Sequence, residues 1–162
     1  MDYLQFNRQK IIDRDRLGNV LAYWRFKGFR IVFTNGCFDI LHLGHVDYLS
    51  KARSLGDVLI IGLNTDGSVR RLKGENRPVN NQEARAQLLA ALDVVDAIVL
   101  FDEDTPYSLI TDVKPDILVK GSDYKPHEIV GADVVLKSGG KIETIDFLDG
   151  YSTTAIIEKL KS

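Results

Sequence analysis

Apolar and polar residues follow one another in short blocks that predict helices and strands in turn. Apolar residues at helical spacing predict a helix over residues 13–27, with Gly28 as its stop, and another over 44–55. Continuous apolar runs, typical of strands buried on both faces, occupy residues 57–64 and 96–101. Further strands are predicted over residues 30–34, 116–121 and 141–147.

Capping residues mark where the later helices begin. Asn81 can cap a helix that carries Leu88 and Leu89, and Ser152 can cap a final helix. Thr105 followed by Pro106 predicts a helix start with the threonine as cap. Residues 65–81 are predicted to form a long polar loop with a basic middle. The sequence leaves open whether residues 1–12 are ordered.

The alternation of strands and helices predicts the fold class. It indicates an α/β, Rossmann-like, doubly wound parallel sheet of about five strands with helices on both faces. Residues 1–28 are expected to be an N-terminal helical extension, and residues 29–162 the main domain, within one globular unit. Such open sheets bind ligands beyond the carboxyl ends of their strands, where the polar motifs of this chain fall.

Composition narrows the classes of partner. The chain has 162 residues, 44% hydrophobic and 27% charged, with a net charge of −2, which does not favour a nucleic-acid partner. No apolar run reaches the ~20 residues of a membrane span, so no membrane partner is expected. The N-terminus lacks the apolar core of a signal peptide, and a cytoplasmic location is the default expectation. Cys37 is the only cysteine, which excludes an internal disulfide and a cysteine-based zinc cluster.

The segment TNGCFDILHLGH, residues 34–45, contains the most informative chemistry. If a helix begins near His42 to Gly44, then His42 and His45 share one face, about 5–6 Å apart at Cβ. Gly44 would let an anion approach the backbone closely, and the helix start adds free N–H groups and partial positive charge. A phosphate site is therefore favoured over a metal site. The plain alternative is that both are ordinary turn histidines.

This pattern resembles the H-x-G-H signature of the nucleotidyltransferase superfamily. The longer run NGCFDILHLGH is similar to one branch, the bacterial ADP-heptose synthases, or heptose 1-phosphate adenylyltransferases. The resemblance extends over nearly the whole chain from Gly28 onward, which makes residues 29–162 a nucleotidyltransferase domain by this similarity. It rests on NTDGSVRRLKGENRPVN (64–80), EDTPYSLI (103–110), PDILVKGSDYKPHEIVGADVV (115–135) and DFLDGYSTTAIIEKL (146–160).

The resemblance implies an adenylyltransferase that uses ATP and Mg²⁺. It would transfer AMP to D-glycero-β-D-manno-heptose 1-phosphate, giving ADP-heptose and pyrophosphate for lipopolysaccharide-type sugar precursors. The nucleophile is a phosphate oxygen that is already an anion, so alignment and charge compensation matter more than a general base. A separate sugar kinase is expected to supply the substrate. The metal ligands, the exact sugar phosphate and a homo-oligomeric state are left open.

The resemblance also implies roles for individual residues. His42 and His45 would donate hydrogen bonds to the triphosphate, and Lys73, in a basic loop that can act as a mobile lid, would bind phosphate. Asp39 either fixes the turn or helps to hold Mg²⁺. Arg85 matches an arginine that related cytidylyltransferases use on phosphate, and the hydroxyls of Ser152, Thr153 and Thr154 at a helix start suit phosphates or act as caps. The remaining residues expected around the nucleotide are Asn35, Gly36, Cys37, Phe38, Gly44, Lys120, Gly121 and Asp123.

Two other functions remain open on the sequence. One is a CTP-dependent cytidylyltransferase of a polyol or amino-alcohol phosphate. Against it, Phe147 stands where those enzymes carry an arginine before their second signature. The other is a nucleotide-binding module without catalysis, which the intact histidine pair disfavours.

Overall fold

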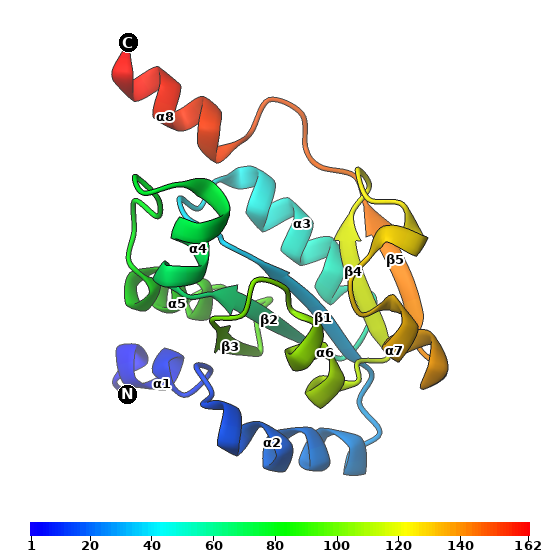
Figure 1. The fold of residues 1–162 in the computed structure, drawn as a ribbon. Coiled ribbons are helices and arrows are strands. Elements are labelled where there is room, and N and C mark those ends of the chain that lie inside the picture. The colour runs from blue at the N-terminus through cyan, green and yellow to red at the C-terminus, as the bar shows by residue number, and fades with distance from the viewer.

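The computed structural model describes residues 1–162 and contains one five-stranded, entirely parallel sheet (Figure 1). Its strand order is β3-β2-β1-β4-β5, so the first strand lies in the middle. The strands are β1 (Ile31–Gly36), β2 (Val58–Asn64), β3 (Ala97–Phe101), β4 (Ile117–Gly121) and β5 (Lys141–Ile145). The predicted fold class is confirmed.

Eight α-helices and one short 3₁₀ helix connect the strands and flank the sheet. They are α1 (Tyr3–Arg8), α2 (Arg14–Phe26), α3 (Leu43–Arg53), α4 (Asp66–Lys73), α5 (Gln82–Ala90), α6 (Tyr107–Val113), η1 (Pro126–Glu128), α7 (Ala132–Lys137) and α8 (Thr153–Lys161). Asn81 and Ser152 cap α5 and α8 as predicted, each accepting a hydrogen bond from a backbone N–H three residues on.

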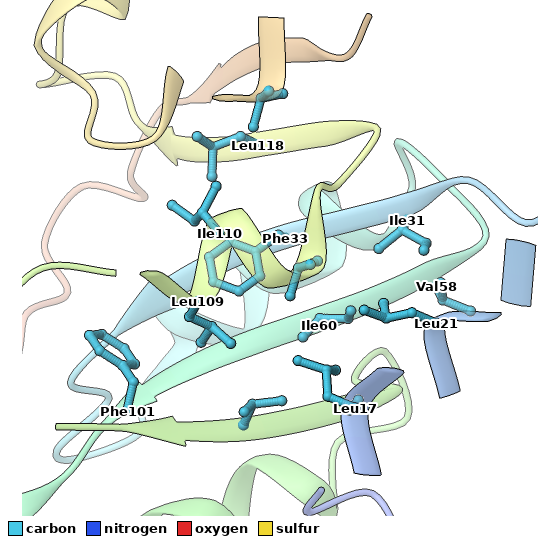
Figure 2. Packing of buried hydrophobic residues seen from close by; sticks show 14 of the residues in the cluster. Leu17, Leu21, Ile31, Phe33, Val58, Ile60, Phe101, Leu109, Ile110 and Leu118 are labelled. Carbon is cyan, nitrogen blue, oxygen red and sulfur yellow. The ribbon is translucent and has the colours of Figure 1, made fainter. Parts of the chain in front are cut away.

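Side chains alternate between the two faces of the sheet and form two apolar cores. On one face, Ile31, Phe33 and Ile60 pack with Leu17 and Leu21 of α2 and with α6 and α7 (Figure 2). On the other face, the intervening strand residues pack with α3 and α5. Because α2 contributes fully buried leucines to the first core, the N-terminal helices pack into the same globular unit as the sheet.

The order of the strands places β1 between β2 and β4, and the chain turns to opposite sides of the sheet there. This is the switch point at which doubly wound sheets bind ligands. In Figure 1 the segments that follow the strands gather at one end of the sheet, between α4, the start of α3 and the start of α8.

Three local predictions were wrong or incomplete. The loop expected over 65–81 contains α4, which Thr65 caps and whose buried side is only Ser68 and Val69, too short an apolar stripe to stand out. The six-residue α7 was not predicted for a similar reason. Thr105 makes no capping hydrogen bond, because Pro106 occupies the N-cap of α6.

The N-terminal residues whose order the sequence left open are structured. Residues 3–8 form α1, and Ile11 makes a parallel bridge to Ile98 at the β3 edge of the sheet. The Ile12 N–H donates to the Ile98 carbonyl at 2.8 Å, which attaches the segment to that edge strand. No helix in the structure is long and apolar enough to cross a membrane.

Candidate active site

A cleft of about 800 Å³ lies at the carboxyl ends of the strands. It is lined by residues that follow each of the five strands, which is why residues far apart in sequence meet there. All the predicted site residues line this cleft except Arg85 and Gly121.

The two histidines lie at the start of α3 with their rings stacked. His42 is the N-cap of the helix, and the His42 and His45 ring centroids are 3.9 Å apart with planes inclined by 23°. The Nδ1 atoms of both rings are buried without a hydrogen-bond partner. In the tautomer that carries its proton on Nε2, each ring can therefore offer an N–H donor to a ligand in the cleft.

Burial keeps both imidazoles neutral. Desolvation lowers the pKa of His42, and desolvation together with the neighbouring His42 lowers the pKa of His45 to about 4. The pair therefore supplies hydrogen-bond donors rather than fixed positive charge to the free cleft near neutral pH.

Two glycines leave room for the rings around the start of α3. A Cβ on Gly44 would lie 2.9 Å from both Cε1 and Nδ1 of His42, so the glycine provides space for the imidazole ring. This is a different reason from the expected close approach of an anion to the backbone. A Cβ on Gly36 would lie 2.9 Å from the Phe38 ring, and Phe38 has a φ of 44°, a left-handed conformation that is strained for this residue type.

Asp39 holds the segment that follows α4. Its buried carboxylate accepts hydrogen bonds from Arg77 Nε at 2.7 Å, from the Val79 N–H at 2.8 Å and from the Asn80 N–H at 2.9 Å. These donors lower the pKa of Asp39 despite its desolvation, which acts in the opposite direction. Of the two roles predicted for Asp39, the contacts favour fixing the turn, because its oxygens are already occupied by these donors.

Arg85 does not lie where the resemblance placed it. Its side chain is completely buried, and it donates to the carbonyls of Asn80, Cys37 and Asn64 at 3.0, 2.7 and 2.8 Å. Its remaining nitrogen pairs with Asp66 at 2.8 Å. The expected phosphate contact is therefore corrected: the guanidinium joins the turn after β1, the end of β2 and the start of α4 from beneath the cleft.

Lys120 and Lys73 are the two cleft lysines, and they differ in environment. Lys120, at the end of β4, hydrogen-bonds Asn35 at the end of β1 and makes no ion pair, and burial lowers its pKa to about 8. Lys73 ends α4, is exposed and makes no ion pair. The cleft therefore has a partly buried cation between β1 and β4 and an exposed one on the side of α4.

The hydroxyl residues at the start of α8 also line the cleft. Ser152 Oγ accepts from the Ala155 N–H at 3.0 Å and so acts as a helix cap, while Thr153 Oγ1 donates to the Ile40 carbonyl at 3.4 Å. Asp123 also lines the cleft, whereas Gly121 lies behind it against Phe147. These positions are compatible with the predicted phosphate contacts of the helix start.

Several cleft residues were not predicted. They include Tyr48, whose hydroxyl is hydrogen-bonded to Thr34 Oγ1 at 2.9 Å, and residues that follow β3, β4 and β5. Position after a strand end was a signal available for Asp104, Thr105 and Tyr124. Three or more His, Cys, Asp or Glu side chains are nowhere grouped closely enough to hold a metal ion.

Comparison with known proteins places this geometry in context. Residues 33–159 match a family model described as Cytidylyltransferase-like. The chain is 53% identical over 155 residues to the "Bifunctional protein HldE" of Wolinella succinogenes, covering 96% of this chain and 32% of that protein. It is 62% identical over 136 residues to the protein of the same name from Nitratiruptor sp., covering 84% and 29%. The chain thus spans about a third of the length of these relatives.

Two solved structures have a similar fold. A lipopolysaccharide core biosynthesis protein from Thermoplasma volcanium matches with a TM-score of 0.63 and 35% identity, over 75% of this chain and 100% of that one. A pantoate-beta-alanine ligase from Francisella tularensis, complexed with beta-gamma ATP and beta-alanine, matches with a TM-score of 0.57 and 18% identity, over 93% and 76%. The second likeness concerns the fold alone.

Proposed function

Because the chain belongs to the cytidylyltransferase-like family of nucleotidyltransferases, we propose that it transfers the AMP group of ATP to a sugar 1-phosphate and releases pyrophosphate. The observation that carries the proposal is the stacked pair of neutral imidazoles at the start of α3, which lines the cleft beside the hydroxyls of α8. Neutral donors, a helix start and two lysines suit a triphosphate, which is a string of anionic oxygens.

The reaction needs little proton transfer. An oxygen of the sugar phosphate forms a bond to the α-phosphorus of ATP, the bond from that phosphorus to the bridging oxygen breaks, and the electron pair leaves with pyrophosphate. The attacking oxygen is already ionised, so the chain supplies position and charge compensation rather than a base. His42 and His45 would donate to the triphosphate as charge moves onto the leaving pyrophosphate, an interaction typically worth about 3–4 kcal/mol of barrier per donor.

The two lysines have complementary roles in this proposal. Lys120 would meet the phosphates between β1 and β4, and Lys73 would approach from α4. Asp39 and Arg85 would hold the backbone that positions these groups without contacting phosphate. Mg²⁺ would be held mainly by phosphate oxygens and water, because three or more His, Cys, Asp or Glu side chains are nowhere grouped closely enough to hold the ion by themselves.

For the acceptor, we propose D-glycero-β-D-manno-heptose 1-phosphate. Support comes from the motif similarity to the heptose 1-phosphate adenylyltransferases and from the similarity to a protein described as acting in lipopolysaccharide core biosynthesis. A sugar kinase, as a separate protein or a separate part of a longer one, would supply this phosphate.

Pyrophosphate release with a matrix of nucleoside triphosphates and sugar 1-phosphates tests the proposal. ATP with the heptose 1-phosphate is expected to give the highest kcat/KM, and His42→Ala and His45→Ala to lower kcat about 100-fold or more. Unchanged turnover in both variants would refute a role for the pair.

The family description favours a second candidate, a cytidylyltransferase. The same matrix separates the two, because that enzyme would release pyrophosphate from CTP in preference to ATP. Phe147 at the cleft, where cytidylyltransferases carry an arginine, supports the adenylyltransferase.

A further inference from the structure

The half-exposed aromatic rings of the cleft all lie on one side of β1. The residues that line the cleft after β2 and β3 include Lys73, Arg77 and Asp104 but no aromatic ring. The residues that line it after β4 and β5 include the charged side chains of Lys120 and Asp123 and the rings of Tyr124, Phe147 and Tyr151. The histidine pair follows β1 and therefore lies between the two sides.

Phe147 is the best defined ring on the apolar side. One face of its ring stacks on Tyr48, with centroids 5.6 Å apart and planes inclined by 25°. Tyr48 is itself fixed, because it is buried and its hydroxyl bonds Thr34. A Cβ on Gly121 would lie 2.2 Å from Phe147 Cζ, so this glycine makes room for the ring.

The other part of the Phe147 side chain is open. The residue is 54% exposed although it is a phenylalanine in the wall of a cleft, and Tyr124 and Tyr151 beside the same cleft are also about half exposed, at 49% and 47%. Water-exposed aromatic surface beside a phosphate site is apolar area that a flat aromatic ligand can cover.

We infer that Phe147 is the stacking platform for the purine base of the nucleotide. The inference rests on the proposed function and deepens it by naming the residue that holds the base. A base presents an uncharged π-face, which suits the exposed ring of Phe147, whereas the phosphates suit the lysines and the histidine pair. A purine covers more of the ring than a pyrimidine does, so Phe147 contributes to the choice of base.

Tripolyphosphate, which lacks the base, provides the decisive comparison. In the full chain, Phe147→Ala is expected to weaken ATP binding roughly 5- to 150-fold, the usual range for losing one base–aromatic stack, with a smaller loss for CTP. The inhibition constant of tripolyphosphate is expected to stay within about twofold, because the phosphate contacts remain. Phe147→Tyr is expected to restore ATP binding. Phe26→Ala serves as the matched control, since Phe26 is 87% exposed on α2 and does not line the cleft.

Phe147→Leu keeps apolar cover over Tyr48, so it tests the platform even if the alanine variant folds poorly. Equal weakening of ATP and tripolyphosphate would overturn the inference, as would unchanged ATP binding in the leucine variant. A rise in the KM of the sugar phosphate alone would also overturn it by placing the sugar on the aromatic side. If ATP binds in a Phe147-dependent way but no sugar 1-phosphate is adenylylated, the proposed function fails and the base platform stands.

Discussion

Replacing Arg85 by methionine tests whether this residue supports the cleft or binds the substrate. The guanidinium is completely buried and makes four hydrogen bonds, three to backbone carbonyls and one to Asp66. Methionine fills a similar volume but donates to none of these acceptors, which would remain buried without partners. Hydrogen bonds from a charged donor contribute about 1.5–3 kcal/mol each and are not additive.

The expected loss of unfolding free energy for Arg85→Met is about 3–5 kcal/mol, the usual cost of removing one partner from a buried charged network. Urea unfolding followed by circular dichroism measures it. Arg70→Met is the matched control, because Arg70 is exposed on α4 and makes no ion pair, and its change is expected to stay within about 0.5 kcal/mol. Lysine at position 85 is expected to recover only part of the loss, since one ammonium cannot reproduce the planar donor set of a guanidinium.

The outcome that refutes this reasoning is a stable Arg85→Met protein with weakened tripolyphosphate binding. It would return Arg85 to the phosphate role that the sequence resemblance implied. A large loss of stability, with kcat and KM recovered at low temperature where the variant is folded, would agree with the structural role.

Three further predictions concern single groups of the cleft. Asp39→Asn is expected to lower the free energy of unfolding by about 1–3 kcal/mol, because it weakens the hydrogen bonds that this side chain accepts from Arg77 and from two backbone N–H groups. An unchanged midpoint of urea unfolding would contradict this role of Asp39. The pKa of His45 is about 4 in the folded chain and near 6.5 in the unfolded chain, so the unfolded chain binds the proton more readily. The free energy of unfolding should therefore fall by at most about 3 kcal/mol as the pH is lowered from 6.5 to 4. His45→Gln should reduce this dependence of stability on pH. Lys120 has a pKa of about 8, so ATP affinity of the full chain should decline as pH rises above 8, and Lys120→Arg should remove the decline.

The fold and the family were accessible from the sequence because both leave contiguous signals. Buried strands such as residues 57–64 are uninterrupted apolar runs, and the family motif lies within one turn of chain between β1 and α3. The family prediction is confirmed by the match over residues 33–159. Helices that bury only two residues, such as α4 and α7, leave too weak a pattern to be recognised.

Arg85 and Phe147 show why the rest of the site was less accessible. The local sequence does not distinguish an arginine that binds phosphate from one that is buried in the interior. Arg85 is buried because the carbonyls of Cys37 and Asn64, which are distant in the sequence, accept its hydrogen bonds. The sequence shows that Phe147 stands where cytidylyltransferases carry an arginine. Its stacking on Tyr48, however, depends on two segments that are about 100 residues apart in the chain. Pairings of this kind are set by tertiary packing and have no local pattern.

The charges around the cleft explain why some cations can serve the substrate and others cannot. Arg77 pairs with the buried Asp39, and Arg85 is enclosed by carbonyls, so both are already neutralised or occupied by the chain. Lys120 and Lys73 make no ion pair, and the histidines are neutral until an anion raises their pKa. The arginines therefore form a fixed support, and the lysines and imidazoles retain donors for phosphate. Their replacement should separate the two classes experimentally: losses at the arginines should appear first in stability, and losses at the lysines and histidines first in kcat/KM.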